Sequence, residues 1–187
     1  MAHSLHPQEW VTQYADALYS YTLPRVNDQA LAQDIVQETF LSAWKAREGY
    51  KGEASEKNWL FAICRNKIID HYRRKSTDIM VHIDQDNTED RYFGEPGHWN
   101  QQDEPADWRN AADGEVERKE FYQAFEGCRK KLHDAQQSVF AMKYLDDLDS
   151  AEICKTLGIT PSNYWVLMHR AKLQLRNCLE KNWINPK

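Results

Sequence analysis

The chain has 187 residues, which is enough for one domain of ordinary size or two small ones. No apolar run approaches 18 residues and no charged leader precedes an apolar core, so we expect neither a membrane span nor a signal peptide. The net charge of −5 counts weakly against a nucleic-acid-binding protein, but its distribution favours one. Two basic blocks alternate with acidic ones: the balance is −4 over residues 1–44, +5 over 45–75, −9 over 76–120 and +3 over 121–187.

Apolar periodicity predicts three helices in the N-terminal half, near residues 7–22, 28–47 and 55–76. Pro7 suits a first helical turn, and Ser55 is a candidate N-cap for the third helix. The apolar side of the first helix is formed by Trp10, Tyr14, Ala17 and Tyr21.

The second predicted helix has two unlike faces. One is a core stripe formed by Leu31, Ile35, Thr39 and Ala43. The other is polar, with one leucine at its centre, and comprises Asp34, Gln37, Glu38 and Leu41. A single exposed leucine is unremarkable, but one ringed by polar and acidic side chains suits docking onto a basic partner surface.

The third predicted helix has the opposite polarity. Its core stripe is formed by Phe61, Cys64, Ile68 and Tyr72. An arc of about 60° on the other side carries Trp59, Asn66, Asp70 and Arg73. An aromatic ring beside amide and guanidinium groups suits the binding of an unpaired base and its backbone. A solvated face with favourable C-terminal charges explains the same residues equally well.

Periodicity is absent from residue 77 to about residue 113, a stretch rich in acidic side chains. A structureless segment of this length is unusual inside a compact domain, so we interpret it as an interdomain linker. Its aromatic residues Tyr92, Phe93, Trp99 and Trp108 are unexpected in a simple tether. They either anchor the linker to a partner or pack back on one of the domains.

The C-terminal half begins with a predicted helix over residues 114–132, with Phe121, Phe125, Cys128 and Leu132 in register. Asp134 and Gln137 resemble a capping box that starts a helix reaching Tyr144, and Ser150 is the predicted cap of a short helix ending at Leu157.

The next turn has the pattern of a helix-turn-helix. Gly158 suits a left-handed helix terminator, Thr160 an N-cap and Pro161 a first helical position. The buried side of the last helix comprises Tyr164, Leu167, Met168, Ala171, Leu175 and Cys178. The outward side, which would meet the major groove, comprises Ser162, Trp165, Val166 and His169, flanked by Asn163 and Arg170, with Lys172 and Arg176 further along. Helical bundles that touch no DNA share this geometry.

Cysteine and histidine usage favours neither a metal site nor catalysis. The four cysteines are scattered without a Cys-x-x-Cys pair, and we expect them to be reduced, buried thiols in a cytoplasmic protein. Asp70-His71 lacks further ligands at helical spacing, and no glycine-rich phosphate loop is present. We therefore predict no enzyme activity, catalytic residue, metal or cofactor.

The N-terminal pattern resembles the second conserved domain of bacterial RNA polymerase sigma factors of the extracytoplasmic-function (ECF) group. The matching residues are Asp34, Val36, Gln37, Glu38, Thr39, Phe40, Ala43, Trp44, Trp59, Leu60, Arg65, Asn66, Asp70, Tyr72, Arg73 and Arg74. The C-terminal half is similar to the fourth domain of the same factors at Glu152, Ile153, Leu157, Gly158, Ile159, His169, Arg170, Ala171, Lys172, Leu175 and Arg176. Trp165 and Val166 depart from the basic or small polar residues usual in the family, and apolar contact with thymine methyls would replace part of the polar readout.

The resemblance implies an all-α fold with domain 2 at 1–76, an acidic irregular linker at 77–113 and a helix-turn-helix domain 4 at 114–187. It implies a cytoplasmic initiation factor whose partners are core RNA polymerase, promoter DNA in single-stranded and duplex form and, as is common in the family, an anti-sigma factor, with no membrane contact of its own. The implied polymerase-binding residues are Asp34, Gln37, Glu38 and Leu41. Those for the downstream promoter element are Lys57, Asn58, Trp59, Arg65, Asn66, Asp70, Arg73, Arg74 and Lys75, and those for the upstream element are Thr160, Ser162, Asn163, Trp165, Val166, His169, Arg170 and Lys172.

The alternative is a transcription regulator that binds DNA through the same helix-turn-helix and uses its N-terminal helices to bind a ligand or partner. A regulator has no need of the polar face around Leu41 beside a base-stacking helix, whereas a sigma factor needs both.

Overall fold

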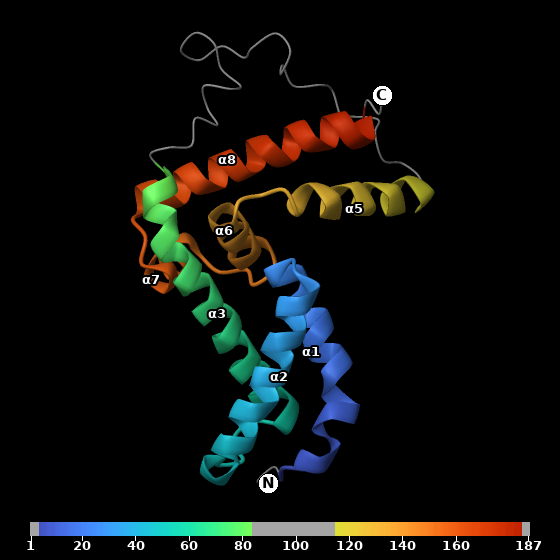
Figure 1. The fold of residues 1–187 in the computed structure, drawn as a ribbon, viewed down its shortest axis with the longest axis vertical. Coiled ribbons are helices and arrows are strands. Elements are labelled where there is room, and N and C mark those ends of the chain that lie inside the picture. The colour runs from blue at the N-terminus through green and yellow to red at the C-terminus, as the bar shows by residue number, and fades with distance from the viewer. Residues whose placement is uncertain (1–3, 84–114, 185–187) are drawn as a thin grey trace. The chain divides into compact units, whose positions relative to one another are not determined.

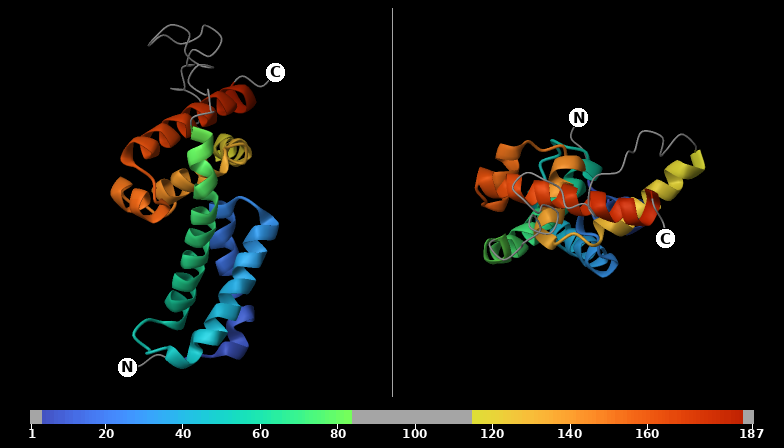
Figure 2. Two further views of the ribbon diagram at one scale, coloured as in Figure 1. Left: turned by 60° about the vertical axis from the view of Figure 1, so that its left-hand side comes forward. Right: turned by 90° about the horizontal axis from the view of Figure 1, so that it is seen from above.

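The computed structural model describes the backbone of residues 4–83 and 115–184, and the side chains of residues 4–75 and 118–184. The chain divides into two compact units, Met1–Lys75 and Ser76–Lys187. All regular secondary structure in the described residues is helical, which confirms the predicted all-α class (Figures 1 and 2). Most of the predicted linker, including its four aromatic residues, lies outside the described residues.

The first unit contains α1 (Trp10–Val26), α2 (Gln29–Ala46) and the part of α3 (Glu56–Ile83) that ends at Lys75. A 3-10 turn, η1 (Pro7–Glu9), precedes them, and a second one, η2 (Arg47–Gly49), follows α2. The three helices were predicted, but two of their ends were wrong. Helix α1 continues through Pro24 and ends where Asn27 adopts a left-handed conformation with φ of 59°. Helix α3 continues to residue 83, so the segment from 77 to 83 is helical and not irregular as predicted.

The core of the first unit confirms the predicted stripe of α2, because Ile35, Thr39 and Ala43 are buried and Leu31 is half-buried. The stripe of α1 differs from the prediction, since Ala17 is exposed. Its buried row advances four residues at a time, through Trp10, the half-buried Tyr14, Leu18, Thr22 and Val26. Residues spaced by four form one ridge along α1, and this ridge packs against the neighbouring helices. Ala17 does not lie on the ridge.

The second unit contains α5 (Glu115–Arg129), α6 (Asp134–Tyr144), α7 (Ser150–Leu157) and α8 (Pro161–Leu179), and a short π-helical turn, η3 (Glu180–Ile184), ends it. Its core cluster comprises Cys128, Leu132, Phe140, Ala171, Leu175 and Leu179, with Phe121 and Phe125 packed against it. The predicted register of α5 is thereby confirmed.

Local capping interactions fix where the helices of the second unit begin. The predicted cap of α7 at Ser150 was wrong, because Asp149 is the N-cap: its carboxylate accepts from the Glu152 N–H at 2.7 Å. The predicted capping box of α6 lies one residue earlier than expected, and the Gln136 side-chain oxygen accepts from the His133 N–H at 3.3 Å.

The turn of the helix-turn-helix has the predicted form. Gly158 ends α7 with a left-handed φ of 69°, and Ile159 is buried behind it. The Thr160 hydroxyl accepts from the Asn163 N–H at 3.2 Å and so caps α8, with Pro161 as its first residue.

Two of the four cysteines are bonded to each other. Cys128 on α5 and Cys178 on α8 form a disulfide, whereas Cys64 and Cys154 are buried free thiols. The prediction of four reduced thiols was therefore wrong for this pair. The pairing could not be read from the sequence, because the two cysteines are 50 positions apart although the C-terminal ends of α5 and α8 meet, with the two Cα atoms 5.6 Å apart.

Candidate functional site

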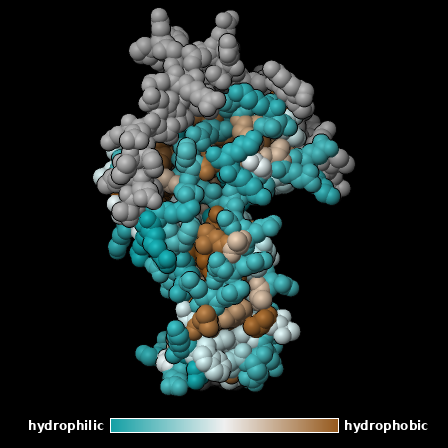
Figure 3. Space-filling view, in the orientation of Figure 1, coloured by the Kyte–Doolittle hydropathy of each residue, from teal (hydrophilic) through white to brown (hydrophobic). Residues whose placement is uncertain are grey.

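The polar face of α2 is open to solvent. Asp34, Gln37 and Glu38 are exposed, and Leu41 is 60% exposed among them. Apolar side chains reach the surface of the first unit among hydrophilic ones (Figure 3). Sequence reasoning did not place Trp44 on this face, although it follows Leu41 by three residues and is 52% exposed. Leu41 and Trp44 therefore extend the apolar part of the face by one helical turn.

Charged side chains from α3 and from the turn after α2 border the polar face of α2. The Glu38 carboxylate lies 3.5 Å from the Lys67 ammonium of α3. Both groups are substantially exposed, so the ion pair adds little stability. The Arg47 guanidinium lies over the Trp44 ring, 4.1 Å from its centroid, and donates to the Trp44 carbonyl at 2.6 Å.

Trp59, predicted to stand free beside Asn66, is instead half-buried at the start of α3. Its ring packs between Tyr50 of the preceding loop, 5.0 Å away by centroid, and Trp10 of α1, 6.1 Å away. The helical periodicity of α3 alone could not show this, because the rings that cover Trp59 come from other elements.

A buried carboxylate holds these elements together. Glu56, in the first turn of α3, accepts from the Trp10 indole N–H at 2.6 Å and from the His6 backbone N–H at 2.5 Å. The Tyr14 hydroxyl donates to the other carboxylate oxygen at 3.4 Å. Burial raises the pKa of the Tyr14 phenol, and the negative charge of Glu56 raises it further. Sequence reasoning missed Glu56, since an acid in a first helical turn is an ordinary surface residue.

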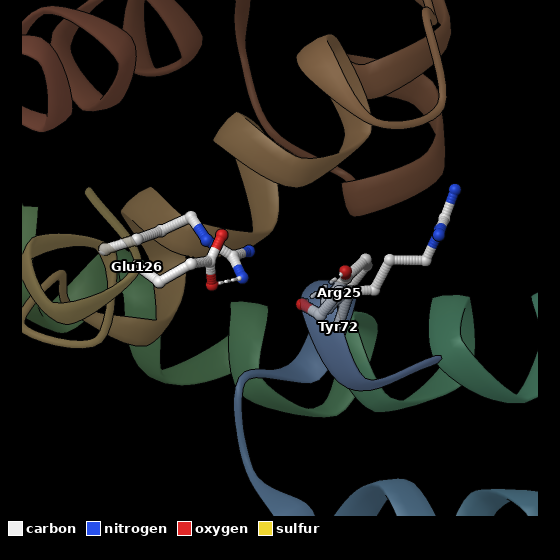
Figure 4. Close-up of polar contacts among 4 residues, drawn as sticks. Arg25, Tyr72 and Glu126 are labelled. Carbon is white, nitrogen blue, oxygen red and sulfur yellow. Dashed lines mark hydrogen bonds and ion pairs between the residues drawn. The ribbon is translucent and has the colours of Figure 1, made fainter. Parts of the chain in front are cut away.

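The rest of α3 presents the predicted polar side chains to solvent. Exposed are Lys57, Asn58, Arg65, Asn66, Asp70, Arg73 and Arg74, while Lys75 is half-buried. The buried Tyr72 hydroxyl donates to the Arg25 carbonyl of α1 at 2.8 Å (Figure 4). This hydrogen bond fixes the rotation of α3 about its own axis just before Arg73 and Arg74. It therefore also fixes the side of the helix on which these two cations lie.

The predicted outward side of α8 is only partly open to solvent. Ser162, His169 and Lys172 are exposed and Trp165 is 61% exposed. Asn163, Val166 and Arg170 are half-buried, which corrects the expectation that Val166 stands free. Thr160 is exposed, but its hydroxyl is engaged as the helix cap. Beneath Trp165 lies the buried Tyr164 ring, whose phenol pKa is raised by burial.

Among the side chains that the structure describes, no three His, Cys, Asp or Glu residues are grouped to hold a metal ion. No helix within the described residues is long and apolar enough to cross a membrane.

The described residues form two helical units, and the second contains a helix-turn-helix. Comparison with known proteins makes the class specific. The family model for sigma-70 region 2 matches residues 10–77, and that for sigma-70 region 4 matches residues 122–175.

Relatives match over most of their length. A probable RNA polymerase sigma factor of Haemophilus influenzae is 36% identical over 170 residues, which cover 90% of this chain and 87% of that one. The ECF RNA polymerase sigma factor SigM of Bacillus subtilis is 24% identical over 163 residues, covering 87% and 88%. The sigma factor RpoE of Bartonella quintana, solved with the anti-sigma factor NepR, gives a TM-score of 0.45 at 19% identity, covering 94% of this chain and 97% of that one.

The chain belongs to the sigma-70 family and is an RNA polymerase sigma factor of the ECF type. It directs transcription initiation at promoters, as members of this family do. The alternative of a transcription regulator whose N-terminal helices bind a ligand or partner does not hold, because that half of the chain matches sigma-70 region 2.

Proposed function

We propose that three helical faces divide the work of this sigma factor. The exposed face of α2, comprising Asp34, Gln37, Glu38 and Leu41 and extended by Trp44, binds core RNA polymerase. The start and outer side of α3 hold the downstream promoter element as a single strand, and the outward side of α8 reads the upstream element as duplex. The protein acts in the cytoplasm without a catalytic step of its own, and anti-sigma control remains a prediction from the family.

The observation that carries this proposal is the 60% exposure of Leu41 within an acidic and amide-bearing helical face. An exposed leucine gains nothing for the folded monomer, whereas a partner that covers it removes apolar surface from water. Asp34 and Glu38 beside it would select a basic partner surface.

Leu41→Ala should weaken binding to core RNA polymerase by about 1–3 kcal/mol, because it removes the apolar centre of the face. Glu38→Lys should weaken binding similarly by reversing a charge. Affinity is measured with labelled factor and purified core enzyme, and circular dichroism confirms that the helices persist.

Each variant has a matched control on α1. Val11 is 64% exposed, so Val11→Ala removes a comparable exposed apolar side chain, and Asp16→Lys makes the same charge reversal at another exposed site. Unchanged polymerase affinity in both α2 variants, or equal losses in the α1 controls, would refute the assignment of the face.

The proposed DNA contacts of α3 separate into base and phosphate contacts. In this proposal Trp59 supports Tyr50 and the loop before α3, since its half-buried ring packs against Tyr50 and Trp10. Asn66→Ala should reduce permanganate reactivity of the melted promoter, because it removes an exposed amide that can hydrogen-bond an unpaired base. Arg73→Ala and Arg74→Ala should each lower the salt slope of promoter binding by just under one unit.

The control for the cations is Lys130→Ala, which removes an exposed charge in the turn after α5. If Arg73→Ala, Arg74→Ala and Lys130→Ala have the same effect on the salt slope, the basic end of α3 is not a phosphate-binding site.

A further inference from the structure

The disulfide-bonded cysteines of the second unit have no role in the polymerase and DNA binding proposed above. We propose that Cys128 and Cys178 are an oxidant-sensitive modification site, in which a hydroperoxide converts two thiols into a covalent link between α5 and the C-terminal end of α8. Their Cα atoms are 5.6 Å apart, a separation that a disulfide spans without backbone movement.

The surroundings of the two sulfur atoms are unequal. Both cysteines line a pocket that Lys131, His133 and Lys181 also line, but Cys128 is 2% exposed whereas Cys178 is half-buried. The Asn182 amide donates to the Cys178 sulfur at 3.4 Å. Cations and a hydrogen-bond donor stabilise a thiolate, so Cys178 is the residue that meets the oxidant and Cys128 is the residue that closes the bond.

The chemistry balances with one hydroperoxide per pair. The Cys178 thiolate attacks the peroxide, the O–O bond breaks, and Cys178 becomes a sulfenic acid while the leaving oxygen takes a proton and departs as alcohol or water. The Cys128 sulfur then attacks the sulfenic sulfur, and the S–S bond forms as the hydroxyl leaves with a proton as water. Two electrons pass from the thiols to the peroxide. A cellular dithiol reverses the reaction by exchange.

The other two cysteines lack these features. Cys64 and Cys154 are buried free thiols on separate units, and burial raises the pKa of both. A buried neutral thiol reacts slowly with oxidants, so they serve as internal controls within the same chain.

The disulfide bears on the proposed role of α8 because one continuous helix connects the outward face of α8 to Cys178. Without the bond, α8 still packs against α5 through Ala171, Leu175 and Leu179 of the shared core. The disulfide joins two positions 50 residues apart and so restricts the unfolded chain. This restriction stabilises the folded second unit. The consequence for transcription rests on the proposed role of α8, whereas the thiol chemistry does not.

The test uses the full chain, purified in reduced form and titrated with hydrogen peroxide. Alkylation followed by peptide mass spectrometry should show Cys128 joined to Cys178, while Cys64 and Cys154 stay free. One melting transition should rise by roughly 10 °C or more and fall again after treatment with thioredoxin or dithiothreitol. Cys178→Ser should abolish both effects and Cys154→Ser should preserve them.

Three results would overturn the proposal: thiols that survive peroxide at a few equivalents, a bond that reductant cannot open in the folded protein, or equal melting temperatures of the two forms. Alkylation of the unaltered chain decides the first two without any variant.

Run-off transcription with core enzyme tests the consequence separately. The oxidised factor should keep its upstream-dependent initiation at temperatures where the reduced factor loses it, and equal loss in both forms would refute the regulatory effect. If Trp165→Ala and Lys172→Ala leave initiation unchanged in both redox forms, the proposed role of α8 fails instead, and the thiol chemistry is unaffected.

Discussion

Glu56 is the residue on which the geometry at the start of α3 depends. Its buried carboxylate accepts from three donors on the N-terminal segment and α1, and the Trp10 ring that it orients packs on Trp59. A carboxylate with several donors at this position sets how α1, the loop after α2 and the first turn of α3 meet.

Glu56→Ala should lower the free energy of unfolding of the first unit by about 2–3 kcal/mol, because buried donors of Trp10 and His6 lose their acceptor. Urea denaturation followed by tryptophan fluorescence measures the loss. Glu53→Ala, at an exposed site in the loop, should change it by less than about 0.5 kcal/mol. Similar free energies of unfolding of the two variants would show that Glu56 does not hold α1 and the start of α3 together.

The turn between α7 and α8 sets the direction of α8 through a backbone conformation that favours glycine. A Cβ built on Gly158 meets no atom within 4 Å, so crowding is absent and only the left-handed φ of 69° opposes a side chain. Gly127, inside α5, also has open space around a built Cβ but lies in a helix interior. The two glycines therefore isolate the effect of backbone conformation.

Gly158→Ala should destabilise the second unit by about 1–2 kcal/mol, since a left-handed alanine is strained. Gly127→Ala should instead stabilise it by about 0.5–1 kcal/mol through higher helix propensity. Chemical denaturation measures both. Changes of the same sign would mean that the space around one of the glycines differs from what the structure shows.

Periodicity along the chain sufficed to predict the existence of the helices and most of their buried faces, because each helix repeats its own pattern. It failed where another element decides the outcome. Trp59 is covered by rings from α1 and the preceding loop, and Cys128 meets a residue 50 positions away. The cap of α7 was misplaced by one residue, since Asp149 and Ser150 are both suitable caps by residue type. The sequence pattern did not indicate that Glu56 is buried, because its burial arises from tertiary contacts.

The two units should behave as separate folding domains, as the predicted boundaries at 1–76 and 114–187 require. Each has its own buried cluster of apolar side chains. We expect calorimetry of the full chain, kept reduced, to show two transitions. Glu56→Ala should shift only one and Gly158→Ala only the other. A single transition that both substitutions lower would contradict the division.

The exposed apolar side chains of α2 bear on the solubility of the free factor. Large apolar groups at a surface promote self-association, and a sigma factor must persist in solution before it finds polymerase. Here the Arg47 guanidinium covers the Trp44 ring, and the carboxylates of Asp34 and Glu38 stand on the same face as Leu41. Two copies of this face would bring like charges together, so the carboxylates of Asp34 and Glu38 oppose the self-association that Leu41 and Trp44 would favour.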